Sequence, residues 1–155
     1  MKREKLIHDR HGRILKFSQE RCDELVYFKL DHAGACAAYA HGRIDGAVLV
    51  ITDLFVESNC VIRQPDFLKR LFGQKTSAIN FQNQGIGSQL VITMITYARS
   101  KGLMRIENRW PENDVRRDSP LAQWFQKRGF KADEASMKMD LKAPAHDDSK
   151  YMPKP

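Results

Sequence analysis

The chain has 155 residues, 42% of them hydrophobic and 29% charged, which fits one compact domain with a buried core. No run of about 18 apolar residues is present, so the sequence predicts no membrane-spanning helix and no membrane partner. The net charge of +7 is scattered and is not interleaved with aromatic residues, which argues against a protein that binds single-stranded nucleic acid.

The first third of the chain predicts a charged arm followed by strands. Residues 1–13 are charged and have no apolar stretch behind them, so we expect an arm and not a secretory signal. Apolar, β-branched and aromatic residues predict strands at 13–17 and 23–31, and 35–41 is expected to return as the next strand. The nearly unbroken apolar run at 47–56 is the strongest strand signal and indicates a central strand that is buried on both faces.

An irregular stretch and then a helix follow this strand. Residues 58–81 show no regular pattern except a short helical one at 65–73. The apolar residues of 88–101 recur with helical spacing, and a strand is expected at 103–107.

The end of the chain predicts a second helix, two short strands and a tail. Polar residues and a proline at 118–120 are typical of a helix start. Short strands are expected at Phe130 and 137–141, whereas 142–155 is rich in Pro, Lys and Asp and is expected to be disordered. The sequence therefore predicts a single α/β domain over 1–141, with a mixed α+β sheet and helices packed on it.

The segment 81–88, with the sequence FQNQGIGS, carries the clearest chemical signal. Two glycines spaced by one residue allow a tight turn, and the helix behind them adds unsatisfied backbone N–H groups and the positive end of its dipole. Such an arrangement suits a pyrophosphate, to which Gln82 and Gln84 can also donate. A dinucleotide-binding fingerprint fails because its third glycine would fall at Leu90, and no P-loop sequence is present.

Two stretches resemble one known family. Residues 82–87, QNQGIG, match the Q/R-x-x-G-x-G/A signature of the GNAT superfamily of acyl-CoA-dependent N-acetyltransferases. Residues 121–130, LAQWFQKRGF, are similar to the helix-to-strand ending of that family, and together the matches cover about residues 47–141. The resemblance implies a mostly antiparallel sheet that is splayed at an acyl-CoA cleft, with a bulge at the end of the central strand, which 54–56 resembles.

The resemblance also implies acetyl-CoA as the cosubstrate. The turn would hold the pyrophosphate, and the end of the central strand would hold the pantetheine arm. The cofactor-binding residues implied in this way are Phe55, Val56, Gln82, Asn83, Gln84, Gly85, Ile86, Gly87 and Ser88.

Three features depart from the family pattern. In the family, the link from the central strand to the glycine turn is usually under about ten residues, but here residues 58–81 intervene. We favour an insertion or lid at 58–81. The alternative is that the central strand is displaced and that residues 78–79 form its end. The tyrosine that often protonates the CoA thiolate is replaced by Phe125, so Ser119 or water serves, or the thiolate leaves unprotonated. Asp118 replaces the usual asparagine and is expected to be a helix N-cap.

A base is needed near the end of the central strand, because the acceptor amine must lose a proton to attack the thioester. Glu57 follows this strand directly and is the candidate, with a solvated loop carboxylate as the alternative, and Asp53 lies within the strand. The three cysteines and five histidines show no spacing typical of a metal site or a nucleophilic dyad. We therefore expect no metal and a direct transfer.

These patterns predict a cytoplasmic N-acetyltransferase that transfers an acetyl group from acetyl-CoA to an amine of a small molecule or peptide. The replacement at Phe125 keeps a non-catalytic acyl-CoA-binding or regulatory module as the alternative. A nucleic-acid-binding protein that uses the basic arm is the less favoured third hypothesis. The oligomeric state stays open, with a homodimer as one alternative.

Overall fold

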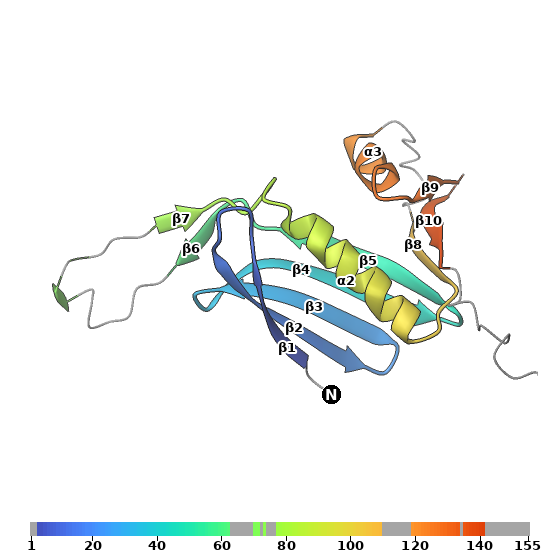
Figure 1. The fold of residues 1–155 in the computed structure, drawn as a ribbon, viewed down its shortest axis with the longest axis horizontal. Coiled ribbons are helices and arrows are strands. Elements are labelled where there is room, and N and C mark those ends of the chain that lie inside the picture. Colours follow the sequence, from blue (N-terminus) through green and yellow to red (C-terminus); the bar gives the residue numbers. More distant parts are fainter. Residues whose placement is uncertain are drawn as a thin grey trace, which may run out of the picture.

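The computed structural model describes residues 3–62, 70–71, 73, 77–109, 119–133 and 135–141. Within this part of the chain, an eight-stranded sheet has the order β1-β2-β3-β4-β5-β8-β10-β9, and β6 and β7 form a separate two-stranded ribbon (Figure 1). Neighbouring strands are antiparallel except β5 and β8, which are parallel. The predicted α/β fold class, with a mostly antiparallel mixed sheet, is therefore confirmed.

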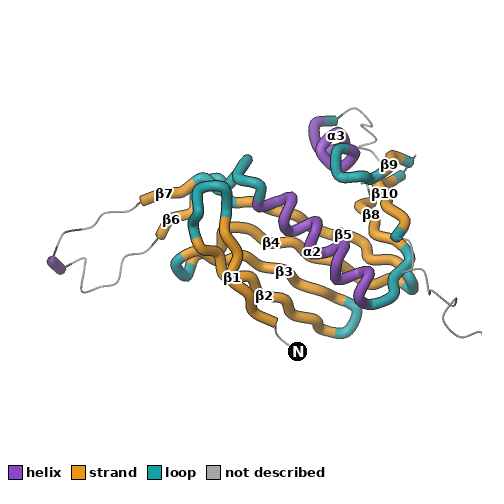
Figure 2. Tube along the Cα trace, in the orientation of Figure 1, coloured by secondary structure: helices purple, strands orange, loops and turns teal. Residues whose placement is uncertain are grey.

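The elements have the following bounds: β1 Arg3–His8, β2 Ile14–Cys22, β3 Leu25–His32, β4 Ala35–Asp45, β5 Val48–Val56, β6 Cys60–Ile62, β7 Ser77–Ile79, α2 Ile86–Ser100, β8 Arg105–Arg109, α3 Pro120–Gln126, β9 Lys131–Ala132 and β10 Ser136–Asp140. Figure 2 shows how tight turns join the first five strands into one meander. No helix in the described ranges is long and apolar enough to cross a membrane.

Helix α2 packs on one face of the sheet (Figure 1). The helix has an apolar face, and the strand opposite it has small residues that allow a close approach. Its buried residues recur with helical spacing from Ile86 to Ala98. Facing residues of β4 are small, and a Cβ atom on Gly42 would come within 2.8 Å of Leu49 Cδ1 and 3.3 Å of Met94 Cε. The weak strand signal of 35–41 thus reflects the close approach that α2 requires.

Strand β5 has two halves with different neighbours. β4 pairs with both halves, whereas β8 pairs only with Val48–Ile51. A register shift against β4 leaves Thr52 without a partner, so the bulge lies at Thr52. This corrects the expected position at the end of the strand. Among the described residues, 52–56 therefore have one edge without a neighbouring strand, on the side where β5 and β8 separate.

The segment expected to be a charged arm contains β1, which pairs with β2 along its whole length. The sequence did not predict this strand because its side chains are mostly charged. An edge strand tolerates charged residues on its solvated face. Residues 110–118 and 142–155 and most of 63–76 lie outside the described ranges, and with them the expected tail, the Asp118 cap and the helical pattern at 65–73.

The chain returns to the end of β5 before the glycine turn begins. β5 ends at Val56, and residues 78–79 belong to β7, so the alternative of a displaced central strand is wrong. The amide of Phe81 donates to the carbonyl of Glu57 over 2.9 Å. The glycine turn therefore starts beside the open half of β5.

Candidate functional site

The turn before α2 exposes backbone donors. Gly85 is the N-cap residue with φ 81°, a left-handed conformation that favours glycine, and no side chain caps it. The first intrahelical bond runs from the Gln89 amide to the Gly85 carbonyl over 3.1 Å. The amides of residues 86–88 precede this bond and have no acceptor within the helix, and the first turn contains no acidic residue. This end of α2 is thus suited to an anion.

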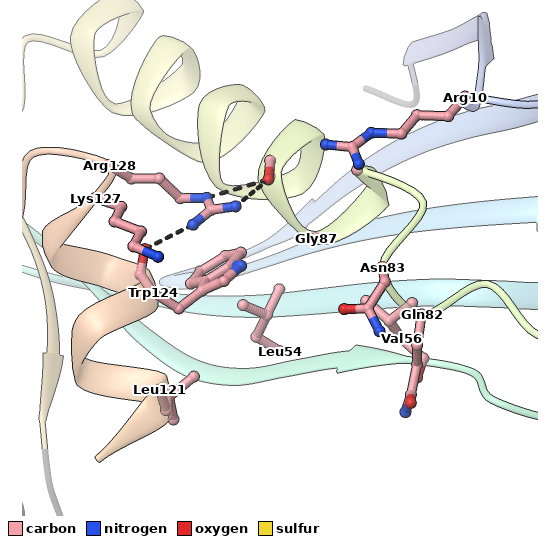
Figure 3. A pocket seen from close by; sticks show the side chains of 12 residues that line it. Arg10, Leu54, Val56, Gln82, Asn83, Gly87, Leu121, Trp124, Lys127 and Arg128 are labelled. Carbon is pink, nitrogen blue, oxygen red and sulfur yellow. Dashed lines mark hydrogen bonds between the residues drawn. The ribbon is translucent and has the colours of Figure 1, made fainter. Parts of the chain in front are cut away.

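A cavity of about 600 Å³ opens between this turn, β5 and α3 (Figure 3). Its lining consists of Arg10, Leu54, Val56, Gln82, Asn83, Gly85, Gly87, Ser88, Leu121, Trp124, Lys127 and Arg128. A side chain larger than alanine at Gly87 would fill the passage, because a Cβ atom there would already be in van der Waals contact, 3.4 Å from Trp124 Cζ2 and 3.6 Å from Val56 Cγ2. The cavity thus joins the exposed amides of α2 to the open half of β5.

The cavity is positively charged. Three of the described residues that line it are cationic (Arg10, Lys127 and Arg128), and none is acidic. The Arg128 guanidinium lies 3.6 Å from the centre of the Trp124 ring, and its Nη1 donates to the Trp124 carbonyl over 2.6 Å. Its Nε donates to Ser88 Oγ over 3.1 Å, and Nη2 donates to the same oxygen. Burial lowers the pKa of Arg128, as expected for a partly desolvated cation without a carboxylate beside it.

Six of the nine cofactor-binding residues that the resemblance implied line this cavity: Val56, Gln82, Asn83, Gly85, Gly87 and Ser88. The other three side chains do not. Phe55 points to the opposite face of the sheet and stacks on Tyr39 at 5.4 Å between ring centres. Ile86 is 1% exposed and belongs to the core, and Gln84 is half-buried outside the lining. Phe55 and Ile86 can therefore reach a ligand only with backbone atoms.

The candidate base Glu57 lies just past β5, outside the cavity lining. Its Oε1 accepts a hydrogen bond from the Asn59 amide over 2.9 Å, which fixes the carboxylate at the start of the loop. Asp53 is exposed on the face opposite α2, beside Tyr39. Burial and the hydrogen bond to Asp53 raise the pKa of Tyr39.

Helix α3 carries Phe125, which replaces the family's acidic tyrosine, and follows directly after Ser119, the alternative proton donor. Ser119 is its N-cap, and Ser119 Oγ accepts from the Ala122 amide over 3.1 Å, a bond that uses the oxygen and not the hydroxyl proton. Phe125 is 1% exposed, and its ring packs edge-on against Trp124 and Phe130, each at 5.0 Å. Phe125 is thus a core residue of this helix.

Sequence reasoning missed the cations of the cavity. Arg10 lies in the turn after β1, a strand that was not predicted, so no local signal placed it near Gly85. Lys127 and Arg128 lie within the second family-like stretch, but at positions to which the pattern assigns no role. The lack of an acidic residue in that stretch was the available hint.

Several solved structures with a similar fold are described as acetyltransferases. The ribosomal-protein-S18-alanine N-acetyltransferase from Escherichia coli matches with a TM-score of 0.55 and 15% identity, over 82% of this chain and 76% of that one. A putative GNAT-family acetyltransferase from Desulfovibrio desulfuricans matches with a TM-score of 0.56 and 11% identity, over 77% and 70%. The PaiA N-acetyltransferase from Thermoplasma acidophilum, solved in complex with coenzyme A, matches with 0.50 and 14%, over 77% and 61%.

No protein-family model and no curated protein matches the sequence. Identities this low define a fold and leave the activity to be argued from the site. The chain has the GNAT fold, as the sequence resemblance implied.

Proposed function

We propose that this protein binds acetyl-CoA in the cavity between β5, α2 and α3 and transfers the acetyl group to an amine. The observation that carries the proposal is the charge of the cavity, which has three cations and no acidic residue in its described lining. Cations that gather around one cavity with no carboxylate among them favour an anionic ligand, and Arg128 is in addition partly desolvated. The GNAT fold supports acyl-CoA as that anion.

The pyrophosphate would lie at the N-terminus of α2. The amides of residues 86–88 are free to donate to it, and Ser88 Oγ already holds the Arg128 guanidinium beside them. This arrangement provides directional donors and positive charge at one place, which matches the geometry of phosphate recognition.

The pantetheine arm would lie along the open edge of β5. No strand in the described part of the chain pairs with residues 52–56 on that side, so their backbone groups can pair with the amides of the arm. Gln82 Nε2 donates weakly, over 3.4 Å, to the Val56 carbonyl, and an incoming amide would replace it. Phe55 and Val56 would thus act through their backbone, in agreement with the outward direction of the Phe55 ring.

The reaction would be a direct transfer within one complex. The acceptor nitrogen attacks the thioester carbonyl, and a backbone N–H on the open edge of β5 stabilises the oxyanion. Glu57, the residue that follows β5, is the proposed base that takes the proton of the amine. Because a thiol has an ordinary pKa of about 8.5, the CoA thiolate can leave without the acid that Phe125 lacks.

The acceptor is a primary amine of a small molecule or a peptide. The three cysteines are free, which suits a reducing compartment, so the proposed location is the cytoplasm.

The test is release of the CoA thiol from acetyl-CoA in the presence of a panel of amines, with an amine-free reaction as control. We expect release that depends on the acceptor, and a mass increase of one acetyl group on the amine. Binding of CoA without turnover on any class of amine would leave a non-catalytic acyl-CoA-binding module. Folded protein that binds neither CoA nor acetyl-CoA would contradict the proposal.

A further inference from the structure

Arg10 reaches the cavity from a distant part of the chain. It lies in the turn between β1 and β2, yet its Nε is 3.3 Å from the position of a Cβ atom on Gly85. Figure 3 shows Arg10 and Arg128 on opposite sides of the first turn of α2, with Gly87 between them. The two guanidinium groups therefore flank the exposed amides of the helix.

Internal hydrogen bonds fix the turn that carries Arg10. The buried Asp9 carboxylate accepts from the amides of His11 and Arg13, over 2.8 and 2.9 Å, and from Arg13 Nε over 2.5 Å. Burial acts to raise the pKa of Asp9, but these hydrogen bonds outweigh it and hold the pKa below its ordinary value. The turn is thus rigid around an ionised carboxylate, and Arg10 sits at its tip.

Two further contacts attach this turn to the glycine turn. The Arg13 guanidinium lies 4.7 Å from the centre of the Phe81 ring, just before the glycines. Gln89 Nε2 donates to the His8 carbonyl over 3.1 Å, just after them. The hairpin is therefore anchored on both sides of the segment that Arg10 overlies.

The Arg10 guanidinium has no polar partner among the described residues. No hydrogen bond or ion pair joins it to another residue in the described part of the chain, whereas the neighbouring Arg13 is paired with Asp9. Among the described residues, this rigid turn presents a guanidinium without a partner to a cavity whose lining has no acidic residue, an arrangement suited to hold an anion.

We propose that Arg10 is a phosphate-binding residue whose guanidinium contacts the pyrophosphate at the N-terminus of α2, opposite Arg128. This inference rests on the proposed function. The helix end supplies amides but only about half a unit charge, whereas a pyrophosphate carries two, and Arg10 supplies charge and a planar pair of donors. The β1–β2 hairpin is therefore part of the ligand site.

The test is calorimetric titration of Arg10→Gln with CoA and with dephospho-CoA, which lacks the 3′-phosphate but keeps the pyrophosphate. Arg21→Gln is the matched control. Arg21 is exposed near the end of β2, so this substitution removes the same charge far from the cavity. We expect Arg10→Gln to lower the affinity for both ligands by about 10- to 100-fold. Arg21→Gln should change neither affinity by more than about twofold. Arg10→Lys, which keeps the charge but loses the fork, should fall between wild type and Arg10→Gln.

Each result has a distinct meaning. Wild-type affinity of Arg10→Gln for both ligands would overturn the inference while the proposed function stands. A loss for CoA alone would assign Arg10 to the 3′-phosphate and overturn the pyrophosphate contact. Equal losses of affinity in Arg10→Gln and Arg21→Gln would show that the effect comes from net charge alone, which would also overturn the inference. Failure of wild type to bind CoA would instead contradict the proposed function.

Discussion

The two halves of β5 show how one strand serves both the core and the site. Val48–Ile51 lies between β4 and β8, and Leu49, Val50 and Ile51 are at most 4% exposed. Within the described ranges, residues 52–56 pair with β4 alone, and the side chains of Leu54 and Val56 line the cavity. The first half therefore stabilises the sheet, whereas the second half leaves an edge free for a ligand.

The boundary between the halves has a physical cause. Thr52 is the unpaired residue of a bulge, and a bulge bends a strand and increases its twist. The parallel pairing with β8 ends at Ile51, immediately before it. Substitutions on the two sides of Thr52 should thus have separable effects, those before it on stability and those after it on binding.

Closing the ligand side of the cavity should have the largest effect. Gly87→Phe would fill the space between Trp124 and Val56, and we expect CoA binding to fall by more than about 1,000-fold. Gly87 is in an ordinary helical conformation, so the fold should persist, which thermal unfolding can check. Gly87→Ala is the matched control, because its Cβ fits at normal contact distance. Normal CoA binding by the Gly87→Phe protein would show that CoA does not bind in this cavity.

A core truncation in the first half should come next. Leu49 is 0% exposed, so Leu49→Ala should lower the free energy of unfolding by about 3 kcal/mol, measured in denaturant. The same substitution at Leu54, which is only half-buried, should cost less than about 1.5 kcal/mol but weaken CoA binding. Equal losses of stability at the two leucines would contradict the separation of the halves.

Removal of the proposed base should affect turnover and not binding. Glu57→Gln should lower kcat by about 100-fold on the best acceptor, with CoA affinity unchanged. The neutral amide can still accept the bond from the Asn59 amide, so the loop should keep its conformation. If activity is fully retained, Glu57 is a loop carboxylate that caps Asn59.

The smallest effect is expected at Phe125. Its ring lies in the core between Trp124 and Phe130, and it does not line the cavity. Phe125→Tyr should therefore change CoA affinity and kcat by less than about twofold, because its hydroxyl would not meet the leaving sulfur. Steady-state kinetics with and without the substitution decide this. A clear rise in kcat would show that the helix can supply the missing acid.

Strong local signals predicted the parts of the fold that position the site. The apolar run at 47–56 became β5, and the glycines followed by helical periodicity became the start of α2. Long-range pairing decided the rest. β1 forms only because β2 lies beside it, and the bulge at Thr52 depends on the register with β4. Neither the strand β1 nor the bulge can be predicted from the local sequence pattern.

The candidate site follows the same division. The sequence indicated the donors of the glycine turn, since they are adjacent along the chain. Tertiary contacts brought in Arg10 from the β1–β2 turn and Arg128 from the end of α3. The same contacts turned the ring of Phe55 away from the cavity, because the pleat after the bulge directs Leu54 and Val56 toward α2.

Backbone amide shifts in an NMR titration with CoA test the central claim most directly, since they report on both halves of β5 in one experiment. We predict micromolar affinity, about −7 to −8 kcal/mol, with the largest shifts at residues 52–56 and 82–88 and small shifts at 48–51. Unchanged spectra at millimolar CoA, or shifts that leave residues 52–56 and 82–88 unaffected, would contradict it.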